Sequence, residues 1–303
     1  MRPTVLVGCL AASEDAAPRA FARTLADALQ ARVDAVTVRA SATLDGAEDE
    51  GPEPTRTDVR VEHAASAAAG LQRVIAGERP VLTVLGSARD APHGRVSVGG
   101  TAERVLNGAA RPVVVVPRGY GEHPLRTIAV GFVPTPEAVR ALRTAAALAR
   151  ACDAELVVVT VLRRSPDASD AAVLAARLAP SLSAEARGPA AAILRDAIRA
   201  TAGAEPGGGL RLRRSARLAV EPLVVVGDPS DALLRLSARV GLLVLGSRGY
   251  GPPGVVMPGG AARRVLGGAR CPVMLVPAPR PTRGPRPRVR RSSTTDEATS
   301  SRA

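Results

Sequence analysis

The sequence predicts an α/β protein built from two copies of one domain. Short apolar runs that suit buried strands alternate with longer segments that suit helices, a pattern typical of a parallel sheet with right-handed crossovers. The chain also repeats itself: residues 84–117 align without a gap with residues 244–277, and 19 of the 34 positions are identical. A period this long indicates two whole domains rather than a solenoid. At 303 residues, the chain is also long enough to favour two domains.

The expected elements of the first half follow from runs rich in Val and Leu, with helical segments between them. Strands are expected at residues 5–8, 33–38, 59–62, 81–85 and 113–116. Helices are expected at residues 19–30, 64–76 and near 102–107. The stretch from Ser41 to Thr57 is acidic and contains Pro and Gly, so we expect a solvated loop there.

The pattern restarts after a turn-rich joint at residues 119–124. Strands are expected at residues 127–132, 156–161, 223–226, 242–245 and 273–276. Helices are expected at residues 136–151, 170–178, 190–202, 231–239 and 261–266. We therefore divide the chain into a first domain at 1–120, a second at 121–278 and a tail at 279–303.

The composition limits which residues can fill the cores and what the net charge can indicate about binding partners. Trp is absent and aromatic residues are 1% of the chain, so Val, Leu and Ala must fill the cores. The formal net charge is +13, and every basic residue other than histidine is arginine. Such a bias is typical of a GC-rich coding sequence, so the charge alone does not indicate nucleic-acid binding.

The tail is rich in Pro, Arg, Ser and Thr, and we expect it to be disordered. Seven arginines oppose Asp296 and Glu297, which gives the tail a charge of +5. Contact with nucleic acid, an anionic lipid or an acidic partner is one interpretation. A solvated extension is favoured, because the tail has no aromatic side chain to stack on bases.

Cysteine and histidine are sparse and scattered. Cys9, Cys152 and Cys271 form no C-x-x-C pair, and we expect buried thiols in a reducing compartment. The three histidines are isolated from one another and from cysteine, so no metal site is expected. No signal peptide or membrane-spanning run is recognisable, which favours a cytoplasmic protein.

A glycine loop follows the strand at 242–245. Gly246, Gly249, Gly259 and Gly260 lie between that strand and the helix expected at 261–266. Glycine lets the backbone approach a ligand closely, and the free N–H groups of a helix start favour anions. Phosphate is the natural candidate for this loop, and tight turns without a ligand are the alternative.

The spacing of Gly246, Gly249 and Gly259 resembles the nucleotide loop of the universal stress protein family, G-x2-G-x9-G-(S/T). The segment 127–136 (TIAVGFVPTP) resembles the family's first strand and turn, and Gly227-Asp228-Pro229 its turn before the third helix. The segment 270–273 (RCPV) resembles the lead into its last strand. The likeness covers nearly all of residues 1–278.

This resemblance implies two domains of the adenine-nucleotide-alpha-hydrolase-like fold. Each would be an open five-stranded parallel sheet of order 3-2-1-4-5, flanked by helices on both faces. Family members pair through their last strands, so residues 113–116 and 273–276 would pair within this chain as a pseudo-dimer. A further homodimer of whole chains is an open alternative.

The resemblance also implies ATP or a related nucleotide as ligand. In an open α/β sheet, ligands bind beyond the carboxyl ends of the strands where the strand order reverses. For the second domain, the candidate ligand-binding residues are Val133, Thr135, Val161, Gly246, Ser247, Arg248, Gly249, Gly259, Gly260 and Ala261. Thr135 has a second interpretation, as the cap of the helix at 136–151. Arg248 is either a phosphate contact or a solvated loop arginine.

Two departures weaken the expected site. Gly260 stands where the family has Ser or Thr, and Val133 stands where it carries Asp. Each lost hydrogen bond to a charged group is worth roughly 1.5–3 kcal/mol, so we expect weak binding. In the first domain, Arg89 replaces the glycine equivalent to Gly249, and Leu10 lies near the expected carboxylate. Arg89 either blocks the loop or contacts an anion, and we expect blockage and a mainly structural domain.

The main hypothesis is a stress-response regulator that binds ATP or a related nucleotide at its second domain. The alternative is a nucleotide-independent structural or interaction module whose sites have decayed. No Ser/His/Asp arrangement, paired-carboxylate motif or Walker loop is present, so we expect no enzyme activity. Slow ATP hydrolysis is a third idea, and it would need an activated water and a metal that no residue evidently supplies.

Overall fold

The structure of the chain is a computed structural model that describes residues 2–9, 16–40, 59–162, 218–248 and 251–280. Within these ranges the strands are β1 (Thr4–Cys9), β2 (Arg32–Ala40), β3 (Val59–Ala64), β4 (Leu82–Gly86), β5 (Val113–Val116), β6 (Thr127–Gly131), β7 (Glu155–Leu162), β8 (Val220–Val226), β9 (Leu242–Gly246) and β10 (Val273–Val276). The helices are α1 (Ala16–Leu29), α2 (Ala67–Glu78), α3 (Gly100–Leu106), α4 (Pro136–Cys152), α7 (Pro229–Leu236) and α8 (Gly260–Leu266).

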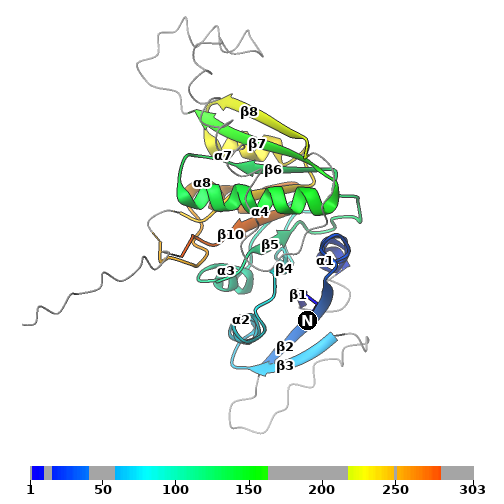
Figure 1. Cartoon of the computed structure of the whole chain (residues 1–303). Coiled ribbons are helices and arrows are strands. Elements are labelled where there is room, and N and C mark those ends of the chain that lie inside the picture. The colour runs from blue at the N-terminus through cyan, green and yellow to red at the C-terminus, as the bar shows by residue number, and fades with distance from the viewer. Residues whose placement is uncertain (1, 10–15, 41–58, 163–217, 249–250, 281–303) are drawn as a thin grey trace, which may run out of the picture.

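The described strands form one continuous ten-stranded sheet of order β3-β2-β1-β4-β5-β10-β9-β6-β7-β8 (Figure 1). Neighbouring strands are parallel except at the centre, where β5 and β10 are antiparallel. Each half of the sheet has the order 3-2-1-4-5, so the predicted fold class is confirmed. In each half the strand order reverses between the first and fourth strands.

The antiparallel pair β5–β10 joins the two halves. Val114 pairs with Met274, and Val115 pairs with Val273. Every residue of both strands is at most 1% exposed. This pairing leaves neither last strand as an open edge, and unpaired apolar edges are the usual route to association with other chains. The pairing expected from the sequence therefore exists within one chain.

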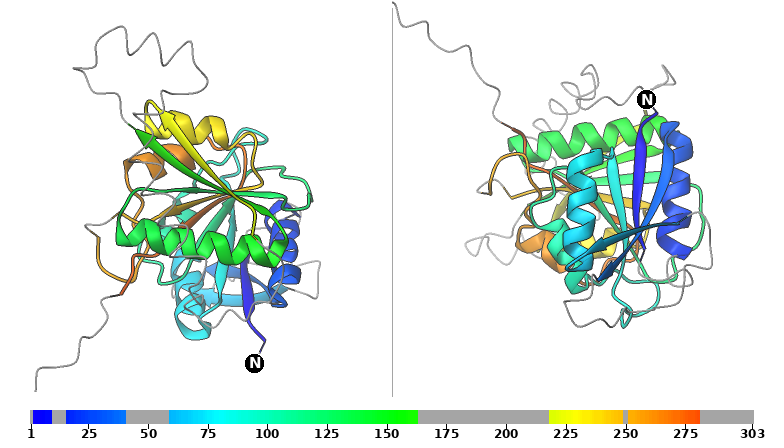
Figure 2. Two further views of the ribbon diagram at one scale, coloured as in Figure 1. Left: turned by 45° about the horizontal axis from the view of Figure 1, so that its top comes forward. Right: turned by 90° about the horizontal axis from the view of Figure 1, so that it is seen from below.

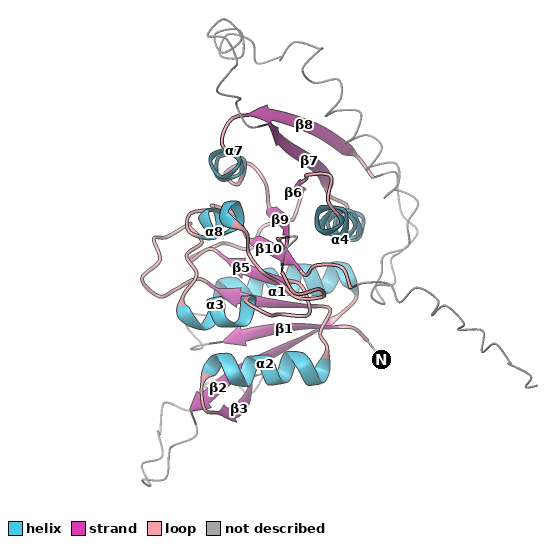
Figure 3. Cartoon of the chain, turned by 90° about the vertical axis from the view of Figure 1, so that its left-hand side faces the viewer, coloured by secondary structure: helices cyan, strands magenta, loops and turns pink. Residues whose placement is uncertain are grey.

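Helices cover both faces of the sheet (Figures 2 and 3). Side chains from α1 and α4 pack with Val114 and Met274 in one core. Side chains from α2, α3, α7 and α8 pack with Val113 and Val273 in the other. Successive strand residues point to opposite faces, so a buried strand must be apolar throughout. The nearly pure Val and Leu runs meet that requirement.

Most element boundaries lie within three residues of those predicted, and two helix starts differ for a capping reason. The Ser66 hydroxyl accepts the Ala69 N–H, so β3 continues to Ala64 and α2 begins only at Ala67. Asp228 caps the helix predicted to start at Asp231, which therefore begins at Pro229. The expected helices at 170–178 and 190–202, the acidic loop and nearly all of the tail lie outside the described residues.

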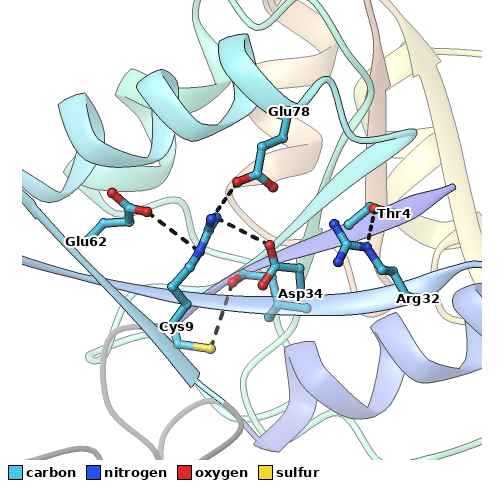
Figure 4. A network of polar contacts seen from close by, with 8 residues as sticks. Thr4, Cys9, Arg32, Asp34, Glu62 and Glu78 are labelled. Carbon is cyan, nitrogen blue, oxygen red and sulfur yellow. Dashed lines mark hydrogen bonds and ion pairs between the residues drawn. The ribbon is translucent and has the colours of Figure 1, made fainter. Parts of the chain in front are cut away.

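A charged cluster ties the outer strands of the first half together (Figure 4). Arg60 on the edge strand β3 forms ion pairs with Asp34 on β2 at 3.3 Å, Glu62 at 3.6 Å and Glu78 at the end of α2 at 2.6 Å. Burial raises the pKa of the Asp34 carboxyl. Since Arg60 is partly exposed, each pair contributes little by itself, and the cluster mainly fixes how β3 sits against α2.

The thiols largely follow the expected burial. Cys9 and Cys271 are buried, and Cys152 is partly buried in the last turn of α4. Burial raises the pKa of Cys152 to about 11 and that of Cys271 to about 12, so neither is a reactive thiolate near neutral pH. In the described ranges, no helix has the length and apolarity needed to cross a membrane, and no three His, Cys, Asp or Glu side chains group as metal ligands.

Candidate functional site

The candidate site of the second half lies where β6 and β9 end side by side. β6 ends at Gly131 and β9 at Gly246, and α4 begins directly after the turn that follows β6. The Thr135 hydroxyl accepts the Ala138 N–H at 3.3 Å, which makes Thr135 the N-cap of α4. The capping interpretation of Thr135 is therefore the one observed. Thr135, Gly246 and the first turn of α4 lie at the same end of the sheet.

Ser247 closes the glycine loop on itself. Its hydroxyl accepts the Met257 N–H at 2.7 Å and lies 3.1 Å from the Met257 carbonyl, to which it donates. In the first half, the Ser87 hydroxyl accepts the Ser97 N–H at 3.2 Å and donates to the Val116 carbonyl at 2.8 Å. Ser247 is 7% exposed, so its hydroxyl is engaged within the protein and not presented to a ligand. Its predicted place in the loop holds, but its side chain has a structural function.

Arg248 follows the same loop. Its backbone N–H donates to the Met257 carbonyl at 2.9 Å, and its guanidinium donates to the Met257 thioether. A β-carbon added to Gly259 would lie 3.7 Å from the Arg248 β-carbon, so these two residues are neighbours across the loop. The structure brings Ser247, Arg248 and Gly259 together, while Gly249 lies outside the described residues.

The far end of the loop leads into α8. Gly259 is the N-cap of this helix and makes no side-chain cap. Gly260 is its first residue, and a β-carbon added there would meet no atom within 4 Å. N–H groups in the first turn of a helix, here including Gly260 and Ala261, have no partner within the helix. Glycine at position 260 therefore removes the hydroxyl that Ser or Thr would supply, although the structure has room for a side chain there.

Val133 and Val161 differ in their surroundings. Val133 follows β6 and is 51% exposed, which is unusual for valine in this structure. Val161 pairs with Val225 of β8 and packs against the core beneath α7. Val133 therefore faces solvent near the expected ligand position, whereas Val161 serves as core packing.

Sequence reasoning missed Thr160. Its hydroxyl is buried and donates to the Phe132 carbonyl at 3.1 Å, and the Phe132 N–H donates to the Val159 carbonyl at 2.8 Å. These bonds hold the chain after β6 against β7. A single polar residue inside a run of valines was the signal that could have identified this position.

The first half has a cavity of about 280 Å³ at the equivalent place. It lies between the ends of β1 and β4 and the start of α1, and Gly8, Gly86 and Ser87 line it. Arg89, His93 and Arg118 also line it. Space remains beside Arg89, which does not support the expected blockage of this loop. Leu10 lies outside the described residues.

Each glycine loop is bound by the opposite half of the chain. The Val96 N–H donates to the Ala269 carbonyl at 2.7 Å, and in the equivalent contact the Val256 N–H donates to the Ala109 carbonyl at 2.8 Å. Both valines are 0% exposed. A hollow of about 230 Å³ lies nearby, lined by Glu103 of α3 and the equivalent Arg263 of α8. The two halves therefore hold each other's loops in place.

The strand order and the loop define a doubly wound α/β protein with a glycine loop at each point of reversal. Residues 124–277 match the model of the universal stress protein family, and the chain belongs to this family. No curated protein matches the chain.

Two solved structures that align with most of this chain give the same fold. A universal stress protein from Archaeoglobus fulgidus DSM 4304 aligns with a TM-score of 0.53 at 15% identity, covering 91% of this chain and 97% of its own. A protein from Pseudomonas aeruginosa UCBPP-PA14 aligns with a TM-score of 0.59 at 13% identity, covering 91% and 93%. A shorter universal stress protein solved in complex with cAMP covers 51% of this chain and 98% of its own at 26% identity, with a TM-score of 0.34.

Proposed function

We propose that the protein is a stress-response regulator that binds ATP or a related adenine nucleotide weakly at residues 121–278, which form its second domain. The observation that carries this proposal is the glycine loop of β9 at the point of strand reversal, next to the start of α4. Membership of the universal stress protein family supports it. The phosphates would lie on the loop from Gly246 to Ala261, and the nucleoside near Val133.

Backbone groups would provide most of the phosphate contacts. The Ser247 hydroxyl is engaged with Met257, and Gly260 offers no hydroxyl. Val133 has an apolar side chain where the family has the carboxylate of Asp. The remaining donors are the N–H groups at residues 259–261, and the Arg248 β-carbon lies next to Gly259 across the loop. Such a site would bind phosphate with little help from side chains, which is why we propose weak binding.

The first experiment is to purify the protein without added nucleotide, denature it and identify the released small molecules by mass spectrometry with their molar ratio. Adenine nucleotide near one equivalent per chain would support the proposal. An empty preparation that also gives no calorimetric signal with millimolar ATP would contradict it.

A gain-of-binding variant tests the position of the ligand. Val133→Asp and Gly260→Ser together restore the two polar groups that the family carries. Since Val133 is largely exposed and Gly260 faces open space, both changes should leave the fold intact. Each restored hydrogen bond should tighten ATP binding by about tenfold or more. Unchanged affinity in the double variant would argue against a nucleotide at this loop.

A matched pair of variants designed to lose binding shows which half of the chain binds ATP. Gly260→Leu and Gly100→Leu each add a bulky side chain at the first residue of a seven-residue helix, where an added β-carbon would meet nothing within 4 Å beyond its own helix and chain neighbours. We expect Gly260→Leu to abolish ATP binding and Gly100→Leu to preserve it. The reverse result would place the ligand at the cavity beside Arg89.

The alternative is a nucleotide-independent interaction module. The engaged Ser247 hydroxyl and the apolar Val133 favour it, because both positions lack a polar group for the ligand. Under this alternative, none of the variants above would change the calorimetric signal with ATP or the stress response that the protein regulates. We further propose binding without catalysis, which a phosphate-release assay would test, and the cytoplasmic location remains a prediction.

A further inference from the structure

A further concave surface lies on the face of the sheet that α7 covers. This groove, here called the α7 groove, has a volume of about 730 Å³. Its floor is apolar and comes from β7, β8 and α7, including Val159, Leu223, Val225, Leu234 and Leu236. It shares no lining residue with the candidate nucleotide site. Small-ligand sites in proteins are typically about 300–1,000 Å³ with mostly apolar walls, and the α7 groove fits that description.

Four arginines line the α7 groove, and they come from three separate parts of the chain. Arg235 lies in α7, Arg239 follows that helix, Arg270 precedes β10, and Arg95 reaches over from the first half. No Asp or Glu is among the lining residues. Among the described residues, no carboxylate pairs with Arg235, Arg239 or Arg270. The groove therefore combines an apolar floor with a cationic rim that lies next to no carboxylate of the described lining.

Parts of this rim are fixed before any ligand arrives. The Arg95 guanidinium donates to the Gly268 carbonyl at 3.2 Å, which holds it across the boundary between the halves. The Ser237 hydroxyl accepts the Arg270 N–H at 3.0 Å and donates to the Leu234 carbonyl at 2.7 Å, which ties the segment before β10 to the end of α7. Of the four arginine charges, that of Arg95 is held in place, and a preset charge loses less entropy on binding.

We propose that the α7 groove binds a free fatty-acid anion. The hydrocarbon chain would lie on the Val and Leu floor, and the carboxylate would meet the arginine rim. Guanidinium groups match the planar geometry of a carboxylate and form strong charge-assisted hydrogen bonds with it. The apolar floor accounts for a chain rather than a small inorganic anion, and the volume suits a small molecule rather than a protein segment.

Calorimetry of the full chain with octanoate, decanoate and dodecanoate, all below their micelle concentrations, tests the proposal. Burial of additional methylenes should tighten binding by up to about fifteenfold for each two-carbon extension. Decanol, which has the same chain without the charge, should bind at least about tenfold more weakly than decanoate. No binding of any carboxylate, or equal binding of decanol, would overturn the proposal.

Variants locate the site. The pair Arg235→Gln and Arg270→Gln should weaken decanoate binding about tenfold or more, and Ala238→Phe should weaken it by filling the groove. Arg143→Gln is the matched control, because Arg143 is an exposed arginine of α4 on the opposite face of the sheet. An equal loss in Arg143→Gln would indicate nonspecific charge attraction. Binding to phosphatidylglycerol vesicles or to an acidic peptide without binding to decanoate would also overturn the proposal.

Discussion

Gly246 ends β9 directly against Glu137 in the first turn of α4. A β-carbon added to Gly246 would lie 3.0 Å from the Glu137 carbonyl oxygen and 3.1 Å from its carbonyl carbon. Gly86 makes the equivalent approach to the first turn of α1, where an added β-carbon would lie 3.1 Å from the ring of Pro18. The first glycine of the loop is therefore needed for helix packing, whether or not a ligand is bound.

Gly246→Ala should destabilise the protein by about 1–3 kcal/mol, the usual effect of overpacking a close contact. The obstructing atoms belong to the backbone of α4, so a small side-chain movement cannot relieve the contact. Urea denaturation would measure the change. Gly260→Ala is the matched control, because that position is open, and its stability should stay within about 0.5 kcal/mol of wild type. A Gly246→Ala protein as stable as wild type would show that α4 shifts freely.

Thr83→Val should raise stability by about 1 kcal/mol. Thr83 is 0% exposed in β4, and its hydroxyl has no hydrogen-bond partner in the part of the chain that the structure describes. A buried hydroxyl without a partner costs about 1–3 kcal/mol, and valine removes that cost at nearly the same volume. The equivalent residue of the second half, Leu243, is apolar.

Thr160→Val is the contrasting variant and should lower stability by about 1 kcal/mol, because it removes the bond to Phe132 and leaves that carbonyl without it. Both changes replace a buried strand threonine by valine, and denaturation in urea should give opposite signs. A loss of stability in Thr83→Val would mean that its hydroxyl has a partner in solution.

Residues 121–303 expressed alone should self-associate. In the whole chain, β10 pairs with β5 and Val256 is buried against the first half. Removing the first half would expose an apolar strand edge of four residues, Val273–Val276, which favours pairing between copies. Analytical ultracentrifugation would measure the association. A stable, monodisperse monomer of this fragment would contradict the role given to β10.

The cap of α7 should make part of the stability acid-sensitive. The N–H groups of Asp231 and Ser230 donate to the Asp228 carboxylate and lower its pKa below the ordinary 3.8. A lowered folded pKa contributes stability above the unfolded pKa, and this contribution is lost as the pH falls through the folded value. Thermal melts from about pH 6 to about pH 3 would measure it.

Asp228→Asn provides the reference, because asparagine caps a helix at every pH. Below pH 3.8 the wild-type protein should lose stability relative to Asp228→Asn, although general acid unfolding acts on both. Parallel melting curves for the two proteins across the whole range would refute the prediction.

The fold was accessible from the sequence because its determinants are local or repeated. Buried parallel strands must be apolar on both faces, so runs such as 113–116 and 156–161 marked β5 and β7. The repeat then supplied what local patterns cannot, namely that both halves have the same elements in the same order. The helix starts at Ala67 and Pro229 were misjudged because capping by Ser66 and Asp228 depends on which hydrogen bond forms.

The site was less accessible for a physical reason. The glycine spacing predicted a connection between β9 and α8, which the structure has, but the spacing could not show where the side chains point. Ser247 bonds to Met257, Thr135 caps α4, and Val161 packs against the core, so the contacts of these three expected ligand residues are made within the protein. At the α7 groove, Arg95 bonds to Gly268, which lies 173 positions further along the chain. A sequence pattern within one half cannot predict a contact between the two halves.

The reciprocal contacts of Val96 and Val256 also bear on how such a chain can diverge. In a symmetric pair of identical subunits, each substitution occurs twice, so a new charge at the axis meets a copy of itself. Here the two halves are joined and each residue occurs once. Glu103 and its counterpart Arg263 line the same hollow with opposite charges, a combination that a self-pairing single domain could not encode. Because the two halves are joined in one chain, the residues at the contact between them do not have to be complementary to copies of themselves. Each half can therefore change its own residues while it still binds the loop of the other half.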